Sequence, residues 1–88
     1  MEYLQIGEIV RPQGIKGEVK LRAMTSDPER YARLESVYLL KKGEYVEYKV
    51  KKGRCNDGFA VLLLEGVKDR NEAELLRGVK VLDRKSVV

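Results

Sequence analysis

Apolar and charged residues alternate along much of this chain with a period of two, the spacing of half-buried β-strands. The clearest example is the segment 18–24, where Val19, Leu21 and Ala23 share one face and charged side chains occupy the other. The strands predicted from this pattern are residues 3–10, 18–24, 36–41, 45–50, 59–64 and 79–83.

The first and fifth predicted strands depart from simple alternation. In the first, Leu4 and Ile6 share a face, whereas Ile9 falls on the opposite parity after Gly7. A glycine at such a change of parity predicts a bulge or a sharp bend. The fifth strand is apolar on both parities, which is typical of a strand buried on both faces. We therefore expect it to be the most buried strand, with Phe59 packed inward.

Two short helices are predicted between strands. Asp27 followed by Pro28 is typical of a helix start, and the first helix should run for about two turns. Asp69 and Glu72 have the spacing of a capping box at the start of the second helix. Gly78 stands where a glycine commonly ends a helix.

This set of elements predicts an all-β fold. Hairpin turns are expected at residues 42–44 and 56–58, and a sheet of short strands hides its edges best by closing on itself. We predict a small six-stranded antiparallel barrel, closed or nearly closed, with two short helices. One domain is expected over residues 1–84, with 85–88 as a frayed end or the start of a linker.

The composition narrows the chemistry. Histidine is absent and Cys55 is the single cysteine, which excludes histidine-dependent triads, an internal disulfide and a thiolate zinc site. No pair of carboxylates is marked for acid–base work, so we expect no enzyme activity, no cofactor and no metal. The 18 basic and 14 acidic residues give a net charge of +4, which permits an RNA-rich neighbourhood without demonstrating RNA binding.

The chain carries no sign of a membrane segment. No apolar run approaches the roughly 20 residues of a transmembrane helix, and residues 1–10 lack the pattern of a signal peptide. We therefore expect a cytoplasmic, soluble monomer that makes no membrane contact.

The main candidate binding surface is the loop between the first two strands. Its glycines permit positive φ, while Arg11 and Lys16 supply charge that, with exposed N–H groups, could hold an anion. The residues predicted to contact a partner are Arg11, Pro12, Gln13, Gly14, Ile15, Lys16, Gly17 and Glu18. The alternative is a basic turn whose glycines serve only the backbone geometry.

A second candidate surface is the densest basic run of the chain. Its members, which are candidate RNA contacts, are Lys49, Lys51, Lys52 and Arg54. Tyr45 shares the parity of the first two lysines, which is the one hint of an aromatic platform for RNA. The alternatives are a solvated basic face for the lysines and ordinary core or rim packing for the aromatic rings.

Two segments in register resemble a known family. Residues 6–19 resemble the opening motif of RimM, the family of bacterial ribosome maturation factors, and residues 64–78 resemble its second signature. Residues 25–30 also fall where that family has a similar segment. Gln13 stands where the family commonly has histidine, and Lys68 where an acidic residue is common.

The resemblance covers essentially the whole chain and implies a fold and a function. The chain looks like the N-terminal domain of the family, a six-stranded barrel similar to the second domain of translation elongation factors, without the family's C-terminal PRC-type barrel. The resemblance implies binding to the small ribosomal subunit precursor through the head-region ribosomal protein numbered nineteen, and support of small-subunit rRNA processing.

We therefore predict a non-catalytic assembly chaperone that presents the loop 11–18 to its partner. The alternative is an RNA-binding module of OB type that contacts RNA directly through the basic strand. A third interpretation is a structural spacer that only positions a neighbouring domain.

Overall fold

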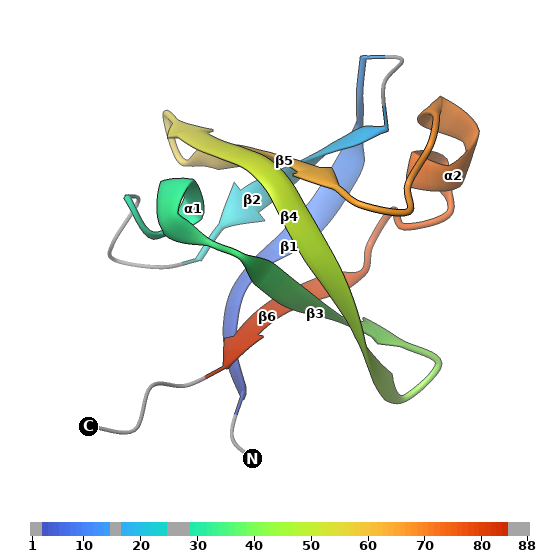
Figure 1. Ribbon diagram of the computed structural model, residues 1–88, viewed down its shortest axis with the longest axis horizontal. Coiled ribbons are helices and arrows are strands. Elements are labelled where there is room, and N and C mark those ends of the chain that lie inside the picture. The colour runs from blue at the N-terminus through green and yellow to red at the C-terminus, as the bar shows by residue number, and fades with distance from the viewer. Residues whose placement is uncertain (1–2, 15–16, 25–28, 85–88) are drawn as a thin grey trace.

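A computed structural model describes residues 3–14, 17–24 and 29–84 of the chain. Its elements are β1 (Tyr3–Gln13), β2 (Glu18–Ala23), α1 (Arg30–Arg33), β3 (Ser36–Lys41), β4 (Glu44–Asn56), β5 (Phe59–Leu64), α2 (Arg70–Glu74) and β6 (Lys80–Arg84). The strands close into a barrel in the order β1-β2-β5-β4-β3-β6 (Figure 1). All neighbouring strands are antiparallel. The predicted six-stranded barrel with two short helices is confirmed.

The barrel interior is filled by one face of each strand. Val19 and Leu21 of β2 are fully buried, as their alternation predicts. On β5, however, the even-numbered residues Ala60, Leu62 and Leu64 point inward, while Phe59 is 36% exposed. The predictions of a strand buried on both faces and of an inward Phe59 are therefore wrong. Closure into a barrel buries the inner face of each strand, whatever residues occupy the outer face.

The predicted irregularity at Gly7 is present. The register of β1 shifts between Gln5 and Gly7 against β6, and again between Ile9 and Arg11 against β2. A Cβ at Gly7 would overlap the Cδ1 atom of the Leu21 side chain, so the close packing at this bend requires glycine. The shift lets residues of both parities on β1 contribute to the core, among them Ile6 and Ile9.

The strand β4 is longer than predicted. It continues past Val50 to Asn56, and its register against β5 shifts between Val50 and Lys52. Glu44 already pairs with Lys41, so the hairpin turn is shorter than the predicted loop. In the turn between β3 and β4, Lys42 and Gly43 have positive φ. In the turn between β4 and β5, Asp57 and Gly58 do.

The helix α1 is shorter than predicted. It begins at Arg30, after Glu29, which makes no side-chain capping bond. The predicted cap Asp27 and the following Pro28 lie outside the described residues. Tyr31 of α1 is fully buried, and its hydroxyl donates a hydrogen bond to the backbone oxygen of Ile6. Tyr31 thus anchors this helix to the hydrophobic core of the barrel.

The start of α2 matches the prediction, whereas its end does not. The Asp69 side chain accepts a hydrogen bond from the Glu72 N–H at 3.0 Å, and the Glu72 carboxylate accepts one from the Lys68 N–H at 2.9 Å. The helix ends at Glu74, and turn residues separate it from Gly78. None of the helices in the described part of the chain is long and apolar enough to cross a membrane.

Candidate binding surface

The predicted loop joins β1 to β2, and the described ends of these two strands lie beside α2 (Figure 1). Gln13 pairs with Glu18 at its base. Gly14 and Gly17 have φ of +69° and +89°, so both use the freedom predicted for them. A Cβ at Gly17 would also overlap the backbone oxygen of Val67. The second glycine therefore lets the hairpin pack against the segment before α2.

The loop residues differ in exposure. Arg11 and Gly14 are exposed, whereas Pro12 and Gly17 are buried. Pro12 thus shapes the loop from inside and cannot offer its ring to a partner. Ile15 and Lys16, also predicted to make contacts, lie outside the described residues.

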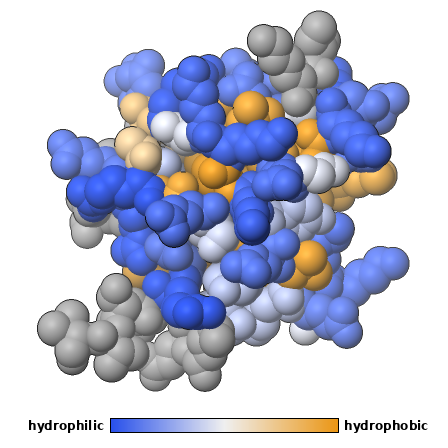
Figure 2. All heavy atoms as spheres, in the orientation of Figure 1, coloured by the Kyte–Doolittle hydropathy of each residue, from blue (hydrophilic) through white to orange (hydrophobic). Residues whose placement is uncertain are grey.

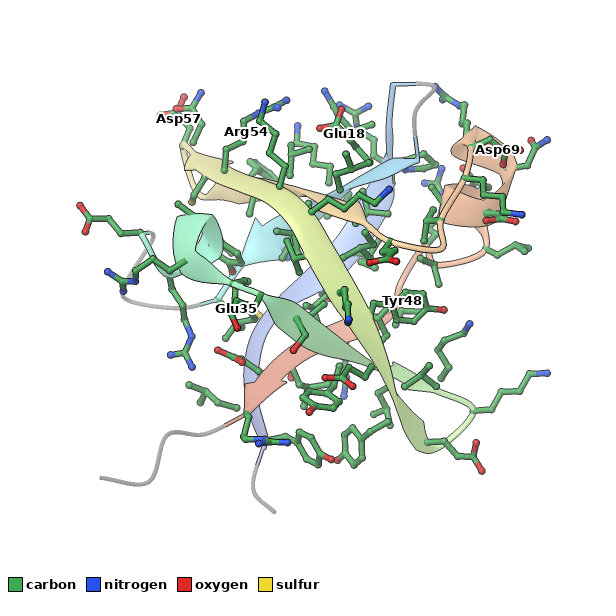
Figure 3. The ribbon with its side chains drawn as sticks, in the orientation of Figure 1. Glu18, Glu35, Tyr48, Arg54, Asp57 and Asp69 are labelled. Atoms are coloured by element: carbon green, nitrogen blue, oxygen red, sulfur yellow. The ribbon has the colours of Figure 1, made fainter. Side chains whose placement is uncertain are left out.

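Gln13 and Glu18 are partly buried at the base of the loop. The Oε1 atom of Gln13 is buried and has no hydrogen-bond partner among the described residues. The Glu18 carboxylate lies 3.5 Å from the Arg54 guanidinium. Such a surface ion pair contributes less than about 1 kcal/mol, but it shows that the loop and the basic run meet (Figure 3).

The four cations of the basic run are all exposed, but they belong to two halves of β4 that pair with different strands. Lys49 pairs with β3, whereas Lys52 and Arg54 pair with β5. Lys51 lies at the register shift between the two halves. Lys52 and Arg54 are therefore the two cations on the side of the barrel that carries the loop, where Arg54 meets Glu18. Charged and polar side chains cover most of the face seen in Figure 2, with apolar groups between them.

A cleft of about 380 Å³ lies beside the loop. The residues that line it are Gln13, Lys20, Arg54, Asn56, Asp57, Phe59 and Val61. The Lys20 ammonium sits 4.5 Å from the centre of the Phe59 ring, a cation–π distance. Sequence reasoning missed Lys20 and Phe59 as site residues. The alternation of β2 places Lys20 on its polar, outward face, and this was a signal for it. Only the pairing of β2 with β5 brings Lys20 close to Phe59.

The described groups with a shifted pKa, which are Tyr31, Glu74 and Arg77, are not among the residues that line this cleft. Burial raises the pKa of Tyr31 to about 12, which fits a structural phenol. On the surface near α2, a hydrogen bond from the Arg77 guanidinium holds the pKa of the Glu74 carboxyl below its usual value. Within the described ranges, no three His, Cys, Asp or Glu side chains are grouped so that they could hold a metal ion.

The fold and this surface define a small closed β-barrel domain with a constrained hairpin and a charged sheet face. The sequence profile of the RimM N-terminal domain matches residues 4–87, and the chain belongs to this family. The resemblance seen in the sequence is thereby confirmed.

Individual relatives agree with the family assignment. The ribosome maturation factor RimM of Ruminiclostridium cellulolyticum is 34% identical over 89 residues, which cover 100% of this chain and 53% of that protein. The protein of the same name from Oleidesulfovibrio alaskensis is 43% identical over 82 residues, covering 92% of this chain and 46% of that protein. The chain thus spans about half the length of these curated relatives.

Solved structures show the same barrel. A crystal structure of RimM from Pseudomonas aeruginosa, described as a 16S ribosomal RNA processing protein, superposes with a TM-score of 0.82 at 29% identity, covering 99% of this chain and 53% of that one. The solution structure of the RimM N-terminal domain from Thermus thermophilus gives a TM-score of 0.74 at 26% identity, covering 96% of this chain and 91% of that one.

Proposed function

We propose that this domain acts in the cytoplasm as a non-catalytic binding module in maturation of the small ribosomal subunit. The observation that carries the proposal is the family match over residues 4–87. Relatives with this domain are named ribosome maturation factors, and the Pseudomonas protein is described as processing 16S ribosomal RNA. The partner would be the precursor particle, through the head-region ribosomal protein numbered nineteen, with rRNA processing supported indirectly.

Such a module acts by differential binding. A factor that binds one conformer of an assembly intermediate more tightly than the others raises the population of that conformer. A rigid recognition element suits this task because little conformational entropy is lost on binding. The described base of the hairpin between β1 and β2 has this character, since Gly17 packs against the backbone at Val67 and Pro12 is buried.

The test is a pair of charge-removing variants with equal loss of charge. The double variant Arg11→Ala, Lys16→Ala should weaken binding to the precursor particle about tenfold, or about 1.4 kcal/mol, without lowering the melting temperature much. The control is Lys42→Asn with Lys80→Ala, because asparagine tolerates the positive φ at position 42. Normal binding by a folded loop variant would remove the hairpin from the mechanism.

Direct contact with RNA is the second candidate function. It is favoured by the exposure of the four cations Lys49, Lys51, Lys52 and Arg54 on β4. An NMR titration separates the candidates: the ribosomal protein alone should shift amides near Gly14 and Gly17, whereas naked small-subunit RNA should shift those of β4. A domain that only spaces its neighbours would show no shift with the precursor particle either.

A further inference from the structure

The outer face of β5 carries an apolar stripe. Phe59, Val61 and Leu63 alternate with the buried residues of the strand and therefore point away from the barrel axis. Phe59 is 36% exposed, and the other two are partly exposed. The stripe gives the outside of the barrel a strip of apolar surface that a ligand can cover.

Cations border this stripe on both sides. Val61 pairs with Lys20 of β2 on one side and with Arg54 of β4 on the other. Lys52 stands across from Leu63 and Arg22 across from Phe59. We give the name β5 face to the outward residues of β2, of β5 and of the part of β4 after the register shift, which pairs with β5.

The charge of the β5 face and its margin on β1 is positive on balance. Its cations, including Arg11, which pairs with Lys20 from β1, are Arg11, Lys20, Arg22, Lys52 and Arg54. Its carboxylates are Glu8, Glu18 and Asp57. One of these, Glu18, is already paired with Arg54.

The face combines features that suit single-stranded nucleic acid. Bases stack on an exposed aromatic ring, and flanking cations hold the backbone. Phe59 supplies the ring. The Lys20 ammonium lies over this ring, 4.5 Å from its centre, so a base that stacks there takes its place and the flexible lysine turns to a phosphate. The amides of Gln13 and Asn56 line the same cleft and can both donate to and accept from base edges. A carboxylate-rich peptide would use the cations, but its carboxylate side chains would not stack on the ring as a base does.

We propose that the β5 face binds a single-stranded segment of RNA, with one base against Phe59 and the phosphates beside Lys20, Lys52 and Arg54. The inference rests on the proposed function, because the precursor particle proposed there as the partner contains RNA. It assigns the direct RNA contact to this face and excludes Lys49 and Lys51, which lie outside it.

The experiment is fluorescence anisotropy of this chain with labelled, unstructured octamers of uridine or adenosine over a series of salt concentrations. Three phosphate contacts should give a salt dependence with a slope of about 2 in log Kd against log salt. Phe59→Leu should weaken binding about tenfold with the slope unchanged. Lys20→Gln with Arg54→Gln should weaken binding and lower the slope by about 1.4.

Matched controls remove an aromatic ring and two cations elsewhere. Tyr45 lies in the half of β4 that pairs with β3, is 48% exposed and stacks on Tyr3 of β1. Because it lies outside the β5 face, Tyr45→Leu should leave RNA affinity unchanged. Lys42→Asn with Lys80→Gln should do the same. Thermal melts show which variants are folded, and the charge variant decides the question if Phe59→Leu does not fold.

Four outcomes would overturn the inference. They are absence of octamer binding, equal losses in the controls, equal competition by a duplex of the same sequence, and loss by Phe59→Leu of ribosomal-protein binding instead of RNA binding. If the chain binds the precursor particle but not the octamers, the inference about the β5 face is wrong and the proposed function still stands. If the chain binds the octamers but has no affinity for the precursor particle, the proposed function is wrong.

Discussion

The buried phenol of Tyr31 should make the stability of this barrel fall at high pH. Its hydroxyl donates to the backbone oxygen of Ile6, which also accepts a hydrogen bond from the Met24 N–H at 2.8 Å. Burial raises the pKa of Tyr31 from 10.0 to about 12. The folded protein therefore holds this proton in a pH range where the unfolded chain releases it.

The magnitude follows from proton linkage. Between pH 10 and 12 the folded state binds more protons than the unfolded state, so the free energy of unfolding decreases as pH rises. Full stability is present below pH 10, and the contribution is lost as pH approaches 12. For a pKa difference of this size, the loss at pH 11 is about 1.4 kcal/mol.

The assay compares the wild-type chain with Tyr31→Phe by urea unfolding at pH 8 and pH 11. At pH 8 the variant should be less stable by only about 1 kcal/mol, because the Ile6 oxygen keeps its bond from Met24. Between the two pH values the wild type should lose about 1.4 kcal/mol more than the variant. Since all other titrating groups are common to both chains, an equal loss in both would refute the reasoning.

Three further changes test the local structure. Gly17→Ala should cost clearly more stability than Gly14→Ala, because both positions have positive φ but only the first would overlap neighbouring backbone; equal melting temperatures would contradict this. Asp69→Ala should cost about 1 kcal/mol in chemical denaturation, because the Glu72 N–H loses its acceptor; an unchanged unfolding midpoint would argue against the cap. Arg54→Gln should change stability by less than about 1 kcal/mol, since its ion pair is exposed; a larger loss would show that Arg54 has a structural role.

Local patterns predicted those parts of the fold that local physics decides. The alternation around Val19 and Leu21 gave the right inward face, because a half-buried strand needs only its own period. The capping pattern at Asp69 and Glu72 was also right, since a cap depends on residues three positions apart. Gly7 marked a real bend because few other residues fit where the backbone passes so close to Leu21.

The errors arise where distant segments decide the outcome. The apolar residues of β5 predicted burial on both faces, but closure of the barrel left Phe59 outside. The second half of β4 was missed because the register shift after Val50 breaks the alternation within a charged run. The pairing of Lys20 with Val61 joins residues far apart in the chain, and no local pattern in either strand shows which partner it will find.

Closure of the barrel also explains how the candidate surfaces come together. Since a closed sheet has no free edges, an apolar stripe can lie on its outer face without inviting strand pairing with other chains. Arg11 belongs to the hairpin and pairs with Lys20 of the β5 face, while Glu18 at the hairpin base reaches Arg54 on its far side. A ligand that follows β5 therefore reaches the hairpin without leaving the barrel. The hairpin and the β5 face are therefore adjacent, so the two proposed contacts, of the hairpin with a protein and of the β5 face with RNA, are compatible with one another.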